Sequence, residues 1–443
     1  MQKLLSPYKR ILANFIGKSN FYKFLLTFLL IFIPLFPKFP ALRIMGIYVS
    51  VRLEDFLILF TFLAFLIPIF TNFKSLIKLK ITRSILIFLF IGLVSTISAI
   101  YLTQTVSSKI VLLHLFRRVE YLSLFFIGFA YVKYVNTDKK IFEYIIKVLL
   151  LVNLFIFLYG LGQRYLDFPV VTTQNEEYSK GIALRWVPGS HINSTFAGHY
   201  DLASYLILTM PIFAASFFVF KEKINKVIFG SSVLIGFWLL SSAVSRISVV
   251  AFLIACSITL LLTKKYKEII IFGLISLIAF GFSPDLRARY GRIIDVVKNK
   301  MSLVYTVYAA DEGPVVFEDR STSIRLNVEW PRAIRAFTKN PLVGTGYSSI
   351  TLATDNDYLR AIGETGILGL LAFILIFFNL SKIYKNIKFT TDFDSIFKVG
   401  MIGSTIAILL TAVFIDIFEA SKFATMFWLF TGLSVGSINK IYE

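Results

Sequence analysis

The sequence predicts an all-α polytopic membrane protein with about twelve transmembrane helices and two long external loops. Of its 443 residues, 57% are hydrophobic and only 16% are charged, and 47 are phenylalanine. A soluble domain of this size could not bury so much apolar surface. The apolar residues also fall in runs of about 17 to 25, the length that a helix needs to cross a hydrocarbon core roughly 30 Å thick.

The predicted spans form three groups separated by two hydrophilic intervals. The first apolar run is followed by Pro, Lys and Arg instead of a small-residue cleavage site, so we interpret it as a retained span and not as a signal peptide. The apolar runs lie near residues 22–37, 53–71, 84–102, 114–134, 142–162, 199–219, 225–243, 246–262, 268–283, 357–380, 396–415 and 421–438. The predicted organisation is 1–162 (helices 1–5), 163–198 (first external loop), 199–283 (helices 6–9), 284–356 (large external loop) and 357–443 (helices 10–12).

Basic residues are concentrated on one side of the predicted membrane. The N-terminal tail, alternate loops and the C-terminal tail together hold more than half of the 46 lysines and arginines. Because cytoplasmic loops are enriched in these residues, we expect both termini in the cytoplasm and both long intervals outside. The net charge of +20 is then a signal of topology. We expect no nucleic-acid partner, since no hydrophilic domain would carry the basic surface.

The sequence shows no cofactor or metal motif. The single cysteine, Cys256, can form no internal disulfide, and His114, His191 and His199 have no ligand-like spacing. A Walker loop, a dinucleotide fingerprint and an HExxH motif are all missing. We therefore expect a protein that uses neither a cofactor nor a metal ion.

Polar side chains gather at the predicted outer ends of the spans, although a charge in mid-bilayer costs about 2.5–3.5 kcal/mol. Asn356, Arg360 and Glu364 are spaced four residues apart at the start of the tenth span, and Asp357 precedes Arg360 by three, so salt bridges on one helical face are possible. Other outer ends add His114, Arg117, Arg118, Glu120, His191, His199, Asp201, Arg246, Asp416 and Glu419. These groups could satisfy one another or lipid headgroups. Alternatively, they could form a site for an anionic substrate at the outer leaflet.

The stretch "DRSTSIRLNVEWPRAIRAFTKNPLVGTGY" in the larger loop predicts one or two short interfacial helices, with Pro331 in a first helical turn. An apolar stripe would face a basic side, the stripe being Leu326, Trp330, Ile334 and Phe337 and the basic side Arg325, Arg332 and Arg335. Such arginines could contact lipid phosphates. Their guanidinium forks could equally grip a diphosphate bidentately.

Residues 325 to 371 resemble the signature region of the O-antigen ligase and polymerase superfamily of bacterial envelope glycan enzymes. The matching pieces are "RLNVEW", "RAFTKNPLVGTG" and "DNDYLRAIGETGILG". The spacing of one Arg, ten residues and one Gly from Arg335 to Gly346 is similar to that of the polymerases. "NSTFAGHYDLASYL" and the Ser-Arg pair at 245–246 resemble two further family segments.

The resemblance implies a metal-independent glycosyltransferase in the bacterial cytoplasmic (inner) membrane, which takes a glycan from undecaprenyl diphosphate on the outer face and transfers it to an acceptor hydroxyl. The diphosphate would be bound by Arg246 with Arg325 or Arg335, and Arg185 and Arg360 are further candidates. Asp355 is the expected base, beside Asn356, and His191 or His199 could contribute from the other loop. Expected partners are the lipid-linked oligosaccharide, the glycan acceptor, membrane lipids, and chain-length regulator and flippase proteins.

One departure from the family pattern favours a polymerase over a ligase. Ligases of this family typically carry His-Asn where this chain has Asp355 and Asn356. A ligase that transfers the glycan to a lipid or protein acceptor stays open, as does an oligosaccharyltransferase. A lipid-linked glycan transporter is the alternative of another class, and it would predict charges spread along a mid-bilayer path.

Overall fold

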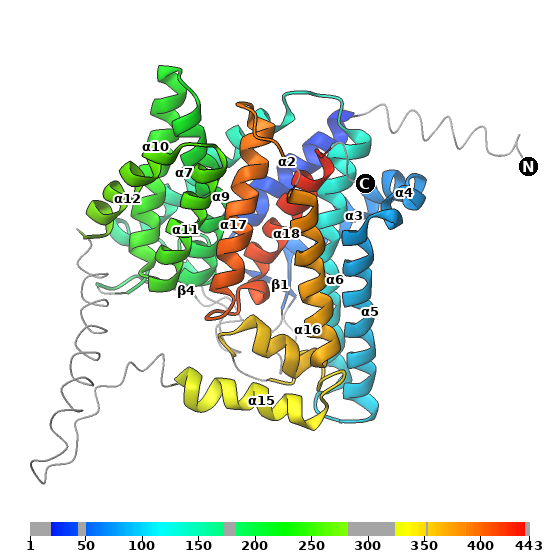
Figure 1. Ribbon diagram of the computed structural model, residues 1–443. Helices are drawn as coiled ribbons and strands as arrows, with labels where there is room; N and C mark the ends of the chain where they lie inside the picture. Colours follow the sequence, from blue (N-terminus) through cyan, green and yellow to red (C-terminus); the bar gives the residue numbers. More distant parts are fainter. Residues whose placement is uncertain are drawn as a thin grey trace, which may run out of the picture.

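A bundle of long helices forms most of the protein in the computed structural model, which describes residues 19–42, 50–171, 183–188, 190–281, 324–350, 353–385 and 387–438 (Figure 1). The helices are α2 (Ser19–Leu35), α3 (Leu53–Thr71), α4 (Phe73–Lys78), α5 (Lys80–Tyr101), α6 (Ser108–Ala130), α7 (Ile141–Tyr165), α9 (His199–Val219), α10 (Lys223–Ala243), α11 (Arg246–Leu262), α12 (Tyr266–Gly281), α15 (Trp330–Lys339), α16 (Asp357–Tyr384), α17 (Phe393–Thr411) and α18 (Ser421–Gly436). Short turns of other helix types are η1 (Tyr131–Val135), η2 (Arg325–Glu329) and η3 (Ile417–Glu419). Two antiparallel strand pairs complete the described part, β1 (Pro40–Leu42) with β2 (Val51–Arg52) and β3 (Val170–Val171) with β4 (Ala183–Leu184).

The all-α membrane class predicted from composition is confirmed. Each predicted span coincides with a helix of the described chain, to within a few residues at most ends. Seven of these helices, α3, α5, α7, α9, α10, α16 and α17, are long and apolar enough to cross a membrane, and α2 and α11 are shorter apolar helices. The full number of about twelve spans stays a prediction.

Helices α9 and α18 lie at the centre of the bundle. Almost every residue of both is buried, because α9 packs against α10, α11 and α17, and α18 packs against α6. Two glycines permit the closest of these contacts. A Cβ atom at Gly128 of α6 would overlap the Leu429 carbonyl oxygen, and one at Gly432 of α18 would overlap that of Phe125. The backbones therefore touch, as is common where small residues meet between membrane helices.

The helix predicted in the larger loop is present as α15, and its interfacial position stays a prediction. It runs along one face of the bundle, crossing the lower ends of the long helices in Figure 1. Pro331 lies in its first turn, as predicted. Most of the remainder of this loop, residues 282–323, lies outside the described chain, as do residues 172–182 of the first loop.

Helix α16 is broken at Gly366, whose φ of 68° and ψ of −173° are not helical. Residues 357–365 form a short first part at the face where α15 lies, and the chain then bends into the long apolar part (Figure 1). At the break, backbone N–H and C=O groups lose their partners within the helix, and the loop before α16 supplies hydrogen-bond partners for them. Ile367 donates to the Pro341 carbonyl at 2.9 Å, and Gly346 donates to that of Glu364 at 2.8 Å. The charged start of α16 therefore precedes the long apolar part of the helix.

Candidate functional site

The site is built around the turn that starts α16. Asn356 caps the helix, because its side-chain oxygen accepts from the backbone N–H groups of Tyr358 at 3.0 Å and Leu359 at 2.9 Å. Asp355, directly before the cap, has a φ of 49°, in the left-handed region that few residues other than glycine adopt. Asp355 therefore lies outside the helix, directly before its cap.

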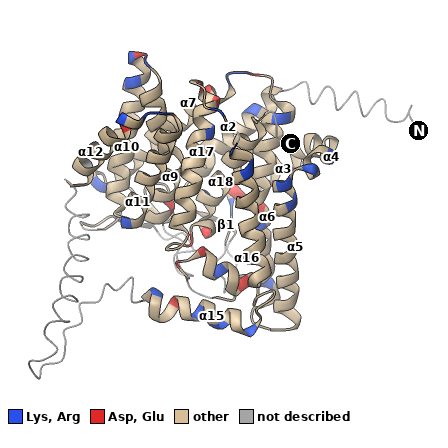
Figure 2. Cartoon of the chain, viewed as in Figure 1, with Lys and Arg blue, Asp and Glu red and all other residues tan. Residues whose placement is uncertain are grey.

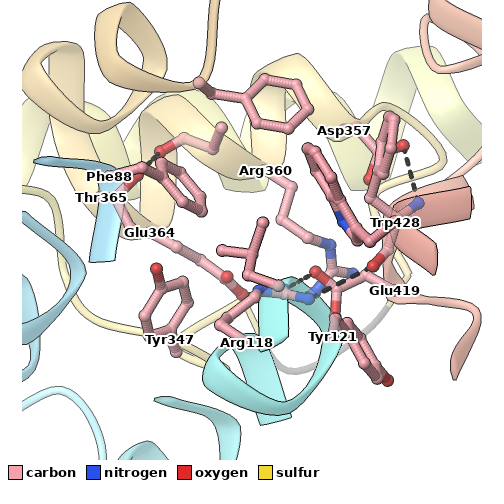
Figure 3. Close-up of a pocket in the computed structure, with 14 residues that line it drawn as sticks. Phe88, Arg118, Tyr121, Tyr347, Asp357, Arg360, Glu364, Thr365, Glu419 and Trp428 are labelled. Carbon is pink, nitrogen blue, oxygen red and sulfur yellow. Dashed lines mark hydrogen bonds and ion pairs between the residues drawn. The ribbon is translucent and has the colours of Figure 1, made fainter. Parts of the chain in front are cut away.

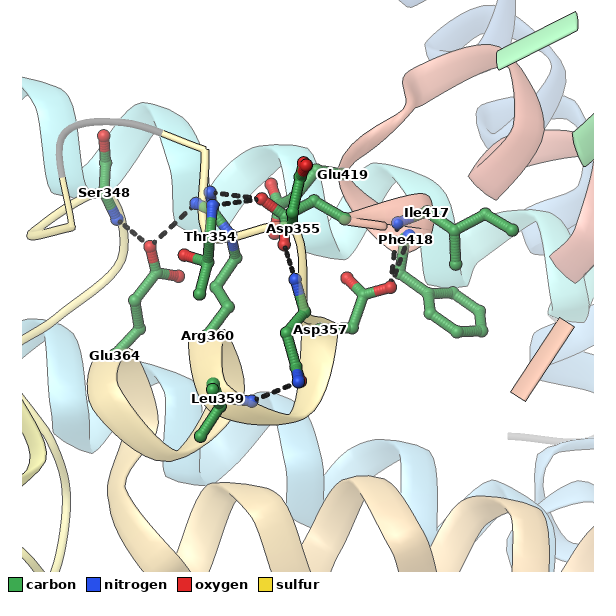
Figure 4. A network of polar contacts seen from close by, with 12 residues as sticks. Ser348, Thr354, Asp355, Asp357, Leu359, Arg360, Glu364, Ile417, Phe418 and Glu419 are labelled. Atoms are coloured by element: carbon green, nitrogen blue, oxygen red, sulfur yellow. Dashed lines mark hydrogen bonds and ion pairs between the residues drawn. The ribbon is translucent and has the colours of Figure 1, made fainter. Parts of the chain in front are cut away.

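Asp416, which lies between α17 and η3, holds this turn in place. Its two carboxylate oxygens accept from the Thr354 N–H at 2.7 Å, the Asn356 N–H at 3.0 Å and Arg360 Nη2 at 2.8 Å (Figure 4). Burial would raise the pKa of Asp416, but the Arg360 guanidinium and the backbone donors lower that pKa below its ordinary value. Asp416 is therefore a charged anchor for the turn that carries Asp355.

Asp357 binds backbone rather than a basic side chain. Its Oδ2 accepts from the N–H groups of Ile417 at 2.8 Å and Phe418 at 3.2 Å, the start of η3 (Figure 4). In return, the Asp357 N–H donates to the Ala412 carbonyl at 2.8 Å. The start of α16 and the α17–α18 connection are thus locked to each other from both sides.

Arg360 and Glu364 form the pair that their spacing predicts. Arg360 Nη1 lies 3.2 Å from Glu364 Oε1, and the same oxygen accepts from the Ser348 N–H at 3.0 Å. Arg118 of α6 pairs with Glu419 and lies over the Tyr347 ring with its guanidinium carbon 5.3 Å from the centroid. A pocket of about 50 Å³ is lined by Arg118, Tyr347, Arg360, Glu364 and Glu419 among others (Figure 3). It has room for a few water molecules only.

Arg325 of η2 meets Asp355 directly. Its Nε and Nη2 lie 3.0 and 2.7 Å from the same Asp355 oxygen, and it also hydrogen-bonds Tyr200 at the start of α9. Burial raises the pKa of Asp355, and the Arg325 guanidinium opposes that shift. The η2 turn is thereby joined both to the turn before α16 and to α9.

Glu329 lies one turn after Arg325 and is a site residue that the sequence reasoning missed. Burial, together with the nearby Asp355 and Asp416 carboxylates, raises the pKa of Glu329 to about 7. Its Oε2 is buried and has no hydrogen-bond partner among the described residues. Arg332, whose charge acts on Glu329, likewise has a buried Nη1 without a partner in the described chain. Grouped by the spacing of a regular α-helix, the residues of this segment form an apolar and a basic group, and Glu329 falls in neither. The π-helical turn of η2 changes which residues share a face, so that grouping does not apply there.

The two predicted histidines lie together. The ring centroids of His191 and His199 are 4.1 Å apart, and His199 is equally close to the Tyr200 ring. The Ile192 N–H donates to the Ser242 carbonyl at 3.1 Å, so the His191 segment lies against the turn that leads into α11, where Arg246 is the first residue. Tyr200 therefore lies between the histidine pair and the pair formed by Arg325 and Asp355.

Two predicted diphosphate ligands lie farther out. Arg335 is exposed on α15, and Figure 2 shows basic residues along this helix. Arg185 is 78% exposed and lies 3.9 Å from Asp167, which is also exposed. Within the described chain, no hydrogen bond or ion pair joins either residue to the Asp355 turn, so the geometry favours Arg325 over Arg335 as a ligand there.

Asp201, another predicted outer-end residue, belongs to a separate buried layer. Lys38 Nζ lies 3.0 Å from its Oδ2, and both side chains are almost fully buried. Lys422 of α18 donates to the carbonyl oxygens of Pro34 at 3.1 Å and Thr195 at 2.7 Å. These contacts tie the C-terminal end of α2 to the N-terminal ends of α9 and α18.

Residues 230–374 match the model of a family described as O-antigen ligase. The matched region contains Arg246, Arg325, Asp355 and Arg360, whereas His191 and His199 precede it. A search of the curated proteins found no match to the chain. The family match confirms the resemblance to the O-antigen ligase and polymerase superfamily that was drawn from the residues, over about a third of the chain.

Proposed function

We propose that the protein is a polysaccharide polymerase of the cytoplasmic membrane, which joins O-antigen-like repeat units carried on undecaprenyl diphosphate at the outer face. The family match supports a membrane glycosyltransferase of the ligase and polymerase type. The observation that carries the finer proposal is the Arg325–Asp355 pair, which lies beside Glu329 and Tyr200 at the end of the bundle where α15 runs.

In the proposed reaction, a hydroxyl of the acceptor glycan attacks the anomeric carbon of the donor. The bond between that carbon and the diphosphate oxygen breaks, the diphosphate leaves with the electron pair, and the hydroxyl proton passes to a protein base. Negative charge grows on the leaving diphosphate, so fixed arginines near it lower the barrier. Arg325 is preorganised by Asp355 and Tyr200 for this role. Arg246, the first residue of α11, is the second proposed diphosphate ligand.

Asp355 is the proposed base, and Glu329 is the second carboxyl group in reach of the same region. An effective base has a pKa near the working pH. Burial raises the pKa of both carboxyl groups, that of Glu329 to about 7. His191 and His199 would complete the site from the α9 side, close to where the acceptor sugar would enter.

The experiment compares the envelope glycan of a deletion strain with that of strains expressing Asp355→Asn, Glu329→Gln or Arg246→Ala. Loss of the base should reduce transfer by about 10²- to 10⁴-fold. Lys339→Ala, at the exposed end of α15, is the matched control and should leave the glycan ladder unchanged. Full activity of both Asp355→Asn and Arg246→Ala, with normal membrane levels, would refute the assignment.

A ligase is the second candidate, because the matching family is described as O-antigen ligase. The deletion strain separates the two activities. Loss of a polymerase leaves acceptor carrying one repeat unit, whereas loss of a ligase leaves bare acceptor while long lipid-linked chains accumulate. Lipid-linked units trapped at the cytoplasmic face would instead indicate a transporter.

A further inference from the structure

A groove lies between α16 and α17 and reaches the end of the bundle opposite the candidate site. Its volume is about 680 Å³, within the range of small-molecule pockets, roughly 300–1,000 Å³. The groove exists because the two consecutive helices diverge. Helix α16 packs mainly against α5, whereas α17 packs mainly against α11 and α9.

The walls of the groove are mainly apolar. Helix α17 contributes Val399, Ile402 and Leu409 from one stripe, and α16 contributes Phe377 and Leu380. From Val399 to Leu409 the stripe covers ten positions, which is about 15 Å of helix. The groove therefore runs from one end of the bundle well into the membrane-spanning part.

Three lysines stand at the mouth of this groove. Lys264 follows α11, and Lys385 and Lys388 follow α16, and all three are exposed. Nearby basic residues are neutralised, since Lys265 lies 3.7 Å from Glu268. Within the described chain, by contrast, no ion pair involves any of the three mouth lysines. An apolar channel that ends in three uncompensated positive charges matches a molecule with an anionic head and a hydrocarbon tail.

We propose that this groove binds one anionic phospholipid of the leaflet in which the lysine-rich ends of the helices lie, the leaflet predicted to be cytoplasmic. The phosphate is held by Lys264, Lys385 and Lys388, and one acyl chain lies along α17. Basic pockets between membrane helices on the cytoplasmic side are suited to such headgroups. A free phosphate would leave the apolar walls unused, and a neutral lipid would leave the lysines without a partner.

The test is native mass spectrometry of the purified full-length protein with added phosphatidylglycerol or, separately, phosphatidylcholine. Wild type should retain one phosphatidylglycerol in preference to phosphatidylcholine. The triple variant Lys264→Gln, Lys385→Gln, Lys388→Gln should lose this preference by about tenfold or more, since each lysine near an anionic headgroup contributes on the order of fivefold. The triple variant Lys74→Gln, Lys78→Gln, Lys80→Gln removes equal charge from exposed positions around α4 and should behave as wild type.

A second variant tests the acyl-chain channel separately. Ile402→Trp fills the groove and leaves the lysines in place, so it should also reduce phosphatidylglycerol retention, with folding checked by its thermal transition. Equal loss in both lysine triples would overturn the proposal in favour of general surface charge. Displacement of the lipid by inorganic phosphate alone, or unchanged retention in Ile402→Trp, would overturn it in favour of a headgroup contact without a channel. All of these outcomes are independent of glycan transfer.

Discussion

Replacing Asp416 with alanine should destabilise the protein by about 3 kcal/mol, because three donors lose their acceptor at once. Two are backbone N–H groups, of Thr354 and Asn356, and the third is Arg360 Nη2 at 2.8 Å. Removing one partner of a buried ion pair costs about 3–5 kcal/mol. The lower end applies here, since Arg360 keeps Glu364 at 3.2 Å. The measurement is the free energy of unfolding of the detergent-purified protein.

The matched control for this prediction is Glu143→Ala on α7. Glu143 accepts from Lys147 at 2.7 Å, a distance like that between Asp416 and Arg360, but the Lys147 side chain is 65% exposed. Exposed pairs four residues apart on a helix contribute about 0.3–0.5 kcal/mol. If Asp416→Ala cost no more than Glu143→Ala, the account of Asp416 as the anchor of the turn would be wrong.

The pH dependence of the Asp416 contribution has a definite sign. Its pKa is lower in the folded protein than in the unfolded chain, so its stabilising contribution is fully present above the unfolded value of about 3.9. It is lost as the pH falls through the folded pKa. The part of the difference between wild type and Asp416→Ala that comes from Asp416 itself should therefore be constant from about pH 5 to pH 8 and shrink only in stronger acid. Measuring both proteins in a Glu329→Gln background removes the titration of Glu329, which the Asp416 charge also affects.

Two other predictions concern catalysis and the break in α16. If Glu329, with its pKa raised to about 7, accepts a proton during transfer, the rate in isolated membranes should rise with pH through that value, and Glu329→Gln should remove the rise. A rise that persists in Glu329→Gln would assign the titration to another group. Gly366→Ala should destabilise the protein by more than 1 kcal/mol, because its Cβ would overlap the Leu342 carbonyl oxygen and its φ is positive. Gly273→Ala, where a Cβ would meet no atom within 4 Å, should be neutral or slightly stabilising in the same unfolding measurement.

The helices could be predicted from the sequence because membrane spans depend on length and apolarity alone. The pairing of Arg360 with Glu364 was equally accessible, since residues four apart share a helical face. The break at Gly366 could not be predicted from the sequence, because the apolar run continues through it and only the backbone angles reveal it. Asp416 as the partner of Arg360 was also out of reach, since the two are 56 residues apart and no spacing rule connects them.

The sequence left two interpretations of the charged groups open: charges that satisfy one another, and a site for an anionic substrate. In the structure, each interpretation fits a different set of residues. The charged groups on α16 and beside η3 form ion pairs with one another or hydrogen bonds with the backbone. Examples are the contacts of Arg360, Asp357 and Asp416. These groups form a scaffold, and substituting them should act through stability. Two carboxyl groups differ, Asp355 before α16 and Glu329 before α15. The Asp355 side chain is 24% exposed, and Glu329 has a buried oxygen without a hydrogen-bond partner in the described chain. Neither carboxyl group belongs to the network that Asp416 anchors, so variants of Asp355 and Glu329 should lose transfer while keeping the wild-type free energy of unfolding to within about 1 kcal/mol. That separation of activity from stability is the physical difference between an anchor and a reacting group.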